Sequence, residues 1–97
     1  MNMNDELFFK LMTRKTILRT LLYLHFNGKT VASRLFSKVG ITNYDIYKKV
    51  VPFLLERGLI ERRKINKKTT VVELTERGRE VTKKLVEISS LLRGEKR

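Results

Sequence analysis

The stretch "LIERRKINKKTTVVELTERG", residues 59–78, carries the most informative pattern in the chain. Its segments "LIERRKI" and "TTVVELT" are rich in β-branched residues and flank the polar tripeptide "NKK". Such a pattern is typical of two antiparallel strands joined by a short turn. Residues 61–70 contain five basic residues and one acidic residue, so this decade alone has a net charge of +4 (five minus one). The sequence therefore predicts a β-hairpin with a strongly basic tip.

The whole chain is also basic. Its 97 residues include 22 Lys and Arg against 10 acidic residues, a formal net charge of +12, and 41% of the residues are hydrophobic. This length suits one domain, and the charge favours nucleic acid as a partner. The longest apolar run is far shorter than the ~20 residues needed to span a membrane. We find no signal-peptide pattern and expect a cytoplasmic protein without membrane contact.

The residues before the hairpin have the pattern of three helices. Residues 13–27, "TRKTILRTLLYLHFN", predict a helix closed by Gly28, and the apolar arc of this helix is wide enough to contact both the core and a partner. A second helix is expected to begin at an N-cap, Thr30, and to run to Val39. After the turn "VGIT", a third helix capped by Thr42 is expected to end at residue 58. Pro52 predicts a kink or break near residue 51.

Two further helices are expected at the ends of the chain. Thr75 is expected to cap a helix over residues 76–93, in which apolar residues recur at spacings of four, three and four. Residues 6–12, "ELFFKLM", predict a short helix that packs against this C-terminal helix, in the same chain or in a second protomer.

The chain offers little for metal or redox chemistry. It contains a single histidine, His25, and no cysteine, which excludes disulfides and thiolate metal sites. His25 fits a partly buried side chain with a backbone or interface hydrogen bond, and the alternatives are a pH switch or a metal ligand. A single histidine with no cysteine and no acidic residue three or four positions away makes a poor metal site. No phosphate-cradling Gly-rich loop and no nucleophile with a base are apparent. We expect no metal, no cofactor and no enzymatic activity.

Residues 16–84 resemble the winged helix-turn-helix DNA-binding regulators, particularly the MarR-like group and the short archaeal Lrs14-like regulators. The strongest signatures are "LLERGLIERR" and "ELTERGREV", with the basic hairpin between them. The resemblance implies an α+β, mostly helical fold: a winged helix-turn-helix with a two-stranded β-hairpin wing and flanking N- and C-terminal helices. Residues 13–75 would form the DNA-binding domain. Residues 1–12 and 76–97 would pack or dimerise around it, and the chain would end in a basic tail.

The implied function is sequence-specific binding of double-stranded DNA by a homodimer that regulates transcription, in our interpretation as a repressor. The N-terminal half of the third helix would read bases in the major groove. The candidates for base readout are Asn43, Tyr44, Tyr47 and Lys48. Either tyrosine fits core covering as an alternative.

Further contacts are expected with the DNA backbone. Candidates near the start of the second and third helices are Thr30, Ser33, Arg34 and Thr42. Candidates on the wing are Arg62, Arg63, Lys64, Lys67 and Lys68. Strand residues alternate between faces, so we expect only some wing residues to contact DNA at once, while Arg62 or Arg63 pairs with Glu61 or Glu73.

Dimerisation would use apolar residues of the first core helix and of both flanking helices. These candidates are Leu7, Phe8, Leu11, Leu22, Phe26, Leu85, Ile88 and Leu92. Two alternatives to a site-specific regulator use the same sequence features. A sequence-independent architectural protein would need only the basic surface, and a winged helix that docks into a protein assembly would not need DNA.

Overall fold

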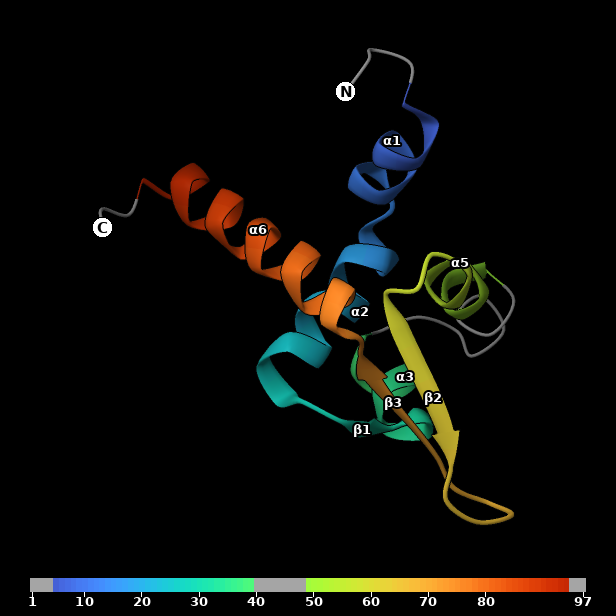
Figure 1. Cartoon of the computed structure of the whole chain (residues 1–97). Coiled ribbons are helices and arrows are strands. Elements are labelled where there is room, and N and C mark those ends of the chain that lie inside the picture. Colours follow the sequence, from blue (N-terminus) through green and yellow to red (C-terminus); the bar gives the residue numbers. More distant parts are fainter. Residues whose placement is uncertain (1–4, 40–48, 95–97) are drawn as a thin grey trace.

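The structure is a computed structural model that describes residues 5–39 and 49–94. Helices surround a small sheet, and the hairpin of β2 and β3 extends to a free tip on the side opposite to α6 (Figure 1). In chain order the elements are α1 (Glu6–Thr13), α2 (Lys15–Asn27), β1 (Thr30–Val31), α3 (Ala32–Lys38), α5 (Val51–Glu56), β2 (Ile60–Lys64), β3 (Thr70–Leu74) and α6 (Glu76–Leu92). No helix within the described ranges is long and apolar enough to cross a membrane.

The sheet confirms the predicted hairpin and adds a strand that we did not predict. All pairings are antiparallel, and the strand order is β1-β3-β2. The extra strand, β1, is only two residues long, with Thr30 opposite Val72 and Val31 opposite Val71. The sheet therefore has three strands, of which two form the projecting hairpin.

The core forms around α2. Ile17, Leu21 and Leu24 of this helix are at most 2% exposed, and they belong to one cluster with buried residues of α3, α5 and the sheet. Gly28 ends α2 as predicted, with φ of 74° and its N–H donating to the Leu24 carbonyl at 2.8 Å. This left-handed conformation is one that glycine adopts without the strain of a Cβ.

Pro52 lies in the first turn of α5, which begins at Val51. A proline is tolerated there because the first N–H groups of a helix have no intrahelical acceptor. Residues 40–48, which include the predicted turn and the first half of the third helix, lie outside the described residues.

The flanking helices pack unequally. Within the chain, α1 contacts α2 rather than packing mainly against the C-terminal helix as we expected, and its Leu11 and Met12 reach the core. In α6, Leu85 is buried and Val81 packs against the core. The end of α6 extends away from the sheet (Figure 1), and Leu92 is 83% exposed.

Thr75 joins the hairpin to α6 with two hydrogen bonds. Its hydroxyl oxygen accepts the Gly78 N–H at 2.9 Å, which confirms the predicted N-cap, and its hydroxyl donates to the Gly58 carbonyl at 2.6 Å. The second bond links the start of α6 to Gly58, two residues after the end of α5. Thr75 thus connects the two ends of the hairpin, because it bonds to Gly58 before β2 and to Gly78 after β3.

Replacing Thr75 by alanine is expected to lower the free energy of unfolding by about 1–2 kcal/mol, since it removes a cap and a second hydrogen bond together. Thr75→Ser retains the hydroxyl and should lose much less. Urea unfolding followed by circular dichroism measures both variants. Equal losses in the alanine and serine variants would contradict the role of the hydroxyl.

Candidate nucleic-acid interface

The two strands of the hairpin are buried unequally, since Val71 and Val72 of β3 are 6% and 1% exposed while β2 is buried only at its first residue. The strands pair from Ile60 opposite Leu74 to Lys64 opposite Thr70. Ile60 and Leu74 are buried, whereas every β2 residue from Glu61 to Lys64 is exposed. Most of β2 therefore projects into solvent, where its charged side chains can meet a partner.

The turn between the strands, residues 65–69, is called here the wing tip. The Ile65 N–H donates to the Thr69 carbonyl at 2.8 Å. The side-chain oxygen of Asn66 accepts the N–H groups of Lys68 and Thr69, both at 2.9 Å. Such Asx turns satisfy backbone donors locally. The wing tip is consequently held in one shape while Lys67 and Lys68 remain exposed.

The basic residues of β2 lie on two different faces of the hairpin. Residues directly opposite each other share a face, so Arg62 and Lys64 lie on the same face as Val72, which belongs to the core. Arg63 lies on the other face and donates to the Glu73 carboxylate at 3.2 Å. The structure thus identifies Arg63 as the wing residue with an ionic partner. The side chains of Arg63 and Glu73 are 65% and 29% exposed, so solvent screens this pair and it contributes little to stability.

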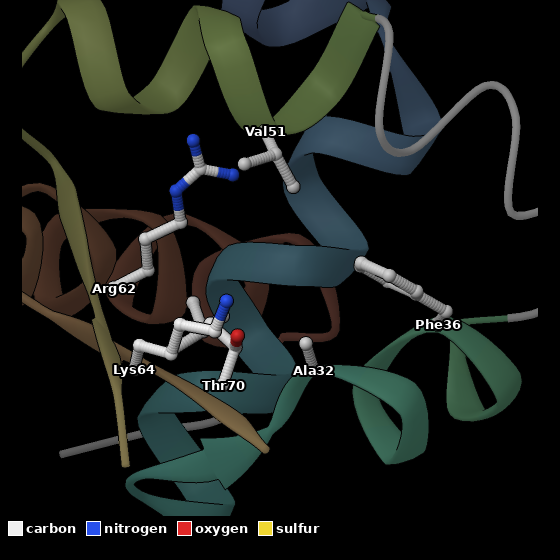
Figure 2. A pocket seen from close by; sticks show the side chains of 7 residues that line it. Ala32, Phe36, Val51, Arg62, Lys64 and Thr70 are labelled. Atoms are coloured by element: carbon white, nitrogen blue, oxygen red, sulfur yellow. The ribbon is translucent and has the colours of Figure 1, made fainter. Parts of the chain in front are cut away.

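Arg62 and Lys64 border a cavity of about 340 Å³ between the hairpin, α3 and α5. Figure 2 shows the Arg62 guanidinium extending toward Val51, while the Lys64 and Thr70 side chains lie together nearer to Ala32. We call this space the basic cavity. The described residues that line it are Ala32, Phe36, Val51, Arg62, Lys64, Thr70 and Val72.

The basic cavity combines positive charge with an apolar floor. Among the described residues, no carboxylate forms an ion pair with Arg62 or Lys64. A guanidinium can donate two parallel hydrogen bonds to a phosphate, an ammonium adds a point charge, and the Thr70 hydroxyl adds a further donor. The apolar floor suits the carbon face of a sugar. This combination fits a phosphodiester backbone better than a metal ion, which needs ligands that donate electron pairs.

Comparison with solved structures identifies the architecture. The chain is similar to AF1382 from Archaeoglobus fulgidus, with a TM-score of 0.74, 16% identity, and coverage of 86% of this chain and 93% of the other. It is also similar to a transcriptional regulator homologue from Pyrococcus horikoshii OT3, with a TM-score of 0.70, 22% identity, and coverage of 92% and 96%. A third similar structure is the transcriptional repressor BigR from Xylella fastidiosa, with a TM-score of 0.68, 22% identity, and coverage of 92% of this chain and 84% of the other. This chain has a winged helix-turn-helix fold. No family model and no curated protein matches its sequence.

Within the winged-helix fold, the predicted cap of the second helix is wrong. Thr30 lies in β1 and is 6% exposed, and its hydroxyl donates to the Gly28 carbonyl at 2.8 Å. The helix begins two residues later, and its N-cap, Val31, makes no side-chain cap bond. Thr30 is therefore unsuited to hold a phosphate. Ser33 and Arg34 are exposed on α3 as expected for backbone contacts.

The four residues predicted to read bases, Asn43, Tyr44, Tyr47 and Lys48, lie outside the described residues. Thr42, predicted to contact the DNA backbone, also lies outside them, so all five roles stay predictions. The described part of the candidate interface consequently consists of the wing and the exposed side chains of α3.

The predicted dimer residues divide into two groups. Leu85 is 9% exposed and belongs to the core of its own chain, while Leu11 and Leu22 are half-buried. The remaining candidates present apolar surface to solvent. Their exposed fractions are 48% for Leu7, 39% for Phe8, 68% for Phe26, 42% for Ile88 and 83% for Leu92.

Sequence reasoning missed the apolar part of the basic cavity and one of its polar groups. The helical spacing placed Ala32 and Phe36 on a buried face, and Thr70 fitted an ordinary strand residue. Val51 was expected to look outward from the third helix, and this expectation is wrong, because Val51 is 2% exposed. The signal for Thr70 was available, because it stands directly opposite Lys64 once the hairpin register is fixed. No local pattern places α3 beside the hairpin, since that contact is set by tertiary packing.

Proposed function

We propose that this winged-helix protein binds double-stranded DNA at specific sites and regulates transcription, as a repressor and as a homodimer. The third helix enters the major groove, and the wing follows the adjacent backbone and minor groove. The observation that carries the proposal is the basic cavity, in which Arg62 and Lys64 lie without ionic partners among the described residues. Such a role places the protein in the cytoplasm, at the nucleoid.

Electrostatics supports this choice of partner. A net charge of +12 on 97 residues is unfavourable to a compact fold through self-repulsion, and binding to a polyanion relieves that repulsion. Part of this positive charge is also concentrated on the hairpin, where a duplex can reach it. The wing tip and the basic cavity belong to one projecting hairpin, so a duplex along it can contact both.

The names of similar structures support regulation. The P. horikoshii protein is described as a transcriptional regulator homologue, and BigR as a transcriptional repressor. At 22% identity these descriptions are a reason to test regulation in this chain and not a transfer of function.

Exposed apolar side chains support a homodimer. Leu91 and Leu92 at the end of α6 are 67% and 83% exposed, and Leu7, Phe8 and Phe9 of α1 are each at least 39% exposed. Burying an apolar surface yields about 25 cal/mol per Å², so pairing of these helices between two copies is favourable. In the dimer the two wings face one duplex.

Selection of bound duplexes from a random library at near-physiological salt, followed by anisotropy titrations over a salt series, tests the proposal. An enriched inverted repeat with half-sites about 34 Å apart is expected for the homodimer. Steep salt dependence without enrichment would instead identify an architectural protein. Absence of binding would leave the protein-docking alternative.

The paired substitution Lys67→Ala with Lys68→Ala should weaken binding to all duplexes alike, by about tenfold, and lower the salt slope by up to about 2, because each lost phosphate contact removes about 0.9. Asn43→Ala or Lys48→Ala should instead reduce the preference between sequences. Lys83→Ala with Lys84→Ala on α6 is the charge-matched control. A wing variant with unchanged affinity and slope would refute the role of the wing tip.

A further inference from the structure

Ile65 is an apolar residue in the most basic part of the chain. It directly follows β2, its side chain is 59% exposed, and Lys64, Lys67 and Lys68 lie within three residues of it. The other large apolar side chains that are exposed within the described ranges belong to the helices or to β1. A single exposed aliphatic residue is common on protein surfaces. Ile65 differs from such residues because it lies at the end of a charged, projecting hairpin, where a DNA partner would meet it.

The backbone around Ile65 is braced, so its side chain is presented at a defined position. The Ile65 N–H is bonded to the Thr69 carbonyl, and the Asn66 side chain closes the turn with two further bonds at 2.9 Å. A braced residue loses little conformational entropy when it enters a partner. An isoleucine also has a stiff, branched side chain, which suits insertion better than a flexible one.

We propose that Ile65 enters the DNA minor groove as an apolar wedge and kinks the duplex. This inference rests on the proposed DNA-binding function and adds a deformation of the DNA to it. Apolar side chains that enter the minor groove unstack a base step and bend the duplex by about 20–90° toward the major groove. The wedge makes contact with sugars and base edges, while the neighbouring lysines neutralise phosphates on both walls of the groove.

The position of Ile65 in the hairpin fits this placement. Ile65 follows Lys64, the last paired residue of β2, so a contact between Lys64 and a phosphate brings Ile65 next to the groove. The minor groove is about 6 Å wide and about 7.5 Å deep, which admits a single aliphatic side chain.

Insertion of Ile65 predicts a preference for certain DNA sequences that arises from how easily the duplex unstacks and not from contacts with base edges. Pyrimidine–purine steps such as TA unstack most easily, so a duplex with a TA step under the wing should bind better than one with a stiff A-tract there. A wing that contacts only phosphates would show the opposite trend, because a narrow A-tract groove has the stronger negative potential.

Fluorescence energy transfer between dyes at the two ends of a selected duplex tests the wedge. Wild-type protein should bend the duplex by at least about 20°. Ile65→Ser should abolish the bend and the TA preference, with an unchanged salt slope and less than about a tenfold loss of affinity, because every charge remains. Ile65→Leu should retain the bend. Val31→Ser, which removes another exposed aliphatic side chain, is the control.

The outcomes separate the wedge from the proposed function. Tight, sequence-specific binding of straight DNA by the wild type, or the same bend in the Ile65→Ser variant, would overturn the wedge and leave the proposed function intact. No binding by the wild type to any duplex would overturn both. As a direct check, the Ile65 δ1 methyl group should give NMR cross-peaks to minor-groove protons, whereas the buried Ile17 methyl group should give none. Absence of the Ile65 cross-peaks would contradict insertion.

Discussion

Replacing Gly78 by alanine is expected to lower the free energy of unfolding by about 3 kcal/mol or more, since a Cβ at this position overlaps a backbone group. The added Cβ would collide with the Leu59 carbonyl oxygen, and it would lie 2.9 Å from the Leu59 carbonyl carbon and 3.2 Å from Leu74 Cδ2. Gly78 is the third residue of α6 and has an ordinary helical backbone. Alanine gains about 1 kcal/mol there from helix propensity, which is too little to offset the collision.

The colliding carbonyl group has no room to move. The Leu59 oxygen accepts the Thr75 N–H at 3.0 Å, and the Leu59 N–H donates to the Leu54 carbonyl at 3.0 Å. Leu59 is itself 7% exposed. A shift of this peptide would disturb the start of α6 and the end of α5 together, so the packing cannot relax cheaply.

Thermal unfolding followed by circular dichroism measures the effect. A loss of 3 kcal/mol lowers the melting temperature of a domain of this size by at least about 12 °C. Glu80→Ala, an exposed position two residues further along α6, is the control and should change the melting temperature little. If the Gly78→Ala variant melts with the wild type, the close approach of α6 to Leu59 is wrong.

Gly78 illustrates which parts of the fold were readable from the sequence. Thr75 and Gly28 were predicted as a cap and a helix end because such signals are local and act through the backbone of their own neighbours. The need for glycine at position 78 arises from Leu59, 19 positions earlier (78 minus 59), and no local pattern expresses that contact.

The errors around Thr30 have a similar origin. A threonine followed by helical periodicity fits an N-cap, but pairing with Val72 draws Thr30 into the sheet instead. A strand of two residues is too short to show a period, so tertiary pairing overrides the local signal. The same limit applies to α1, for which the apolar composition predicted packing but not that α2 would be its partner.

The candidate interface was predictable in charge and not in shape. The positive residues of the hairpin, their position near a tip and the alternation of their faces all follow from residues 59–78. The sequence does not predict which of these residues has an ionic partner. In the structure Arg63 pairs with Glu73, while Arg62 and Lys64 face the basic cavity. This division into paired and unpaired basic residues depends on the register of the strands and on the position of α3. It determines which charges are available to an anionic partner.

The paired substitution Arg62→Ala with Lys64→Ala is expected to reduce affinity for DNA by about a hundredfold. Hydrogen bonds to charged groups contribute about 1.5–3 kcal/mol each, and every 1.4 kcal/mol is tenfold in affinity. The apolar floor formed by Ala32, Phe36 and Val51 keeps water from one side of a bound phosphate, which strengthens these contacts. The lysines of the wing tip lack such a floor, so their removal should cost less.

Anisotropy titrations over a salt series, with the Lys83→Ala and Lys84→Ala pair as the charge-matched control, measure this effect. The salt slope should fall by about 2, and Arg62→Lys should keep the slope while losing part of the affinity, because an ammonium cannot donate the two parallel bonds of a guanidinium. Binding within threefold of the wild type would refute the basic cavity as a phosphate site.

The melting temperature of the Arg62→Ala with Lys64→Ala variant distinguishes a role of these residues in binding from a role in stability. Arg62 and Lys64 lie on one face without ionic partners among the described residues, so their mutual repulsion is unfavourable to the free protein. Their removal should therefore leave the melting temperature unchanged or raise it, whereas residues retained for stability would lower it when removed. Lower DNA affinity together with equal or higher stability would mean that these two charges are retained for an anionic partner at some cost to the fold.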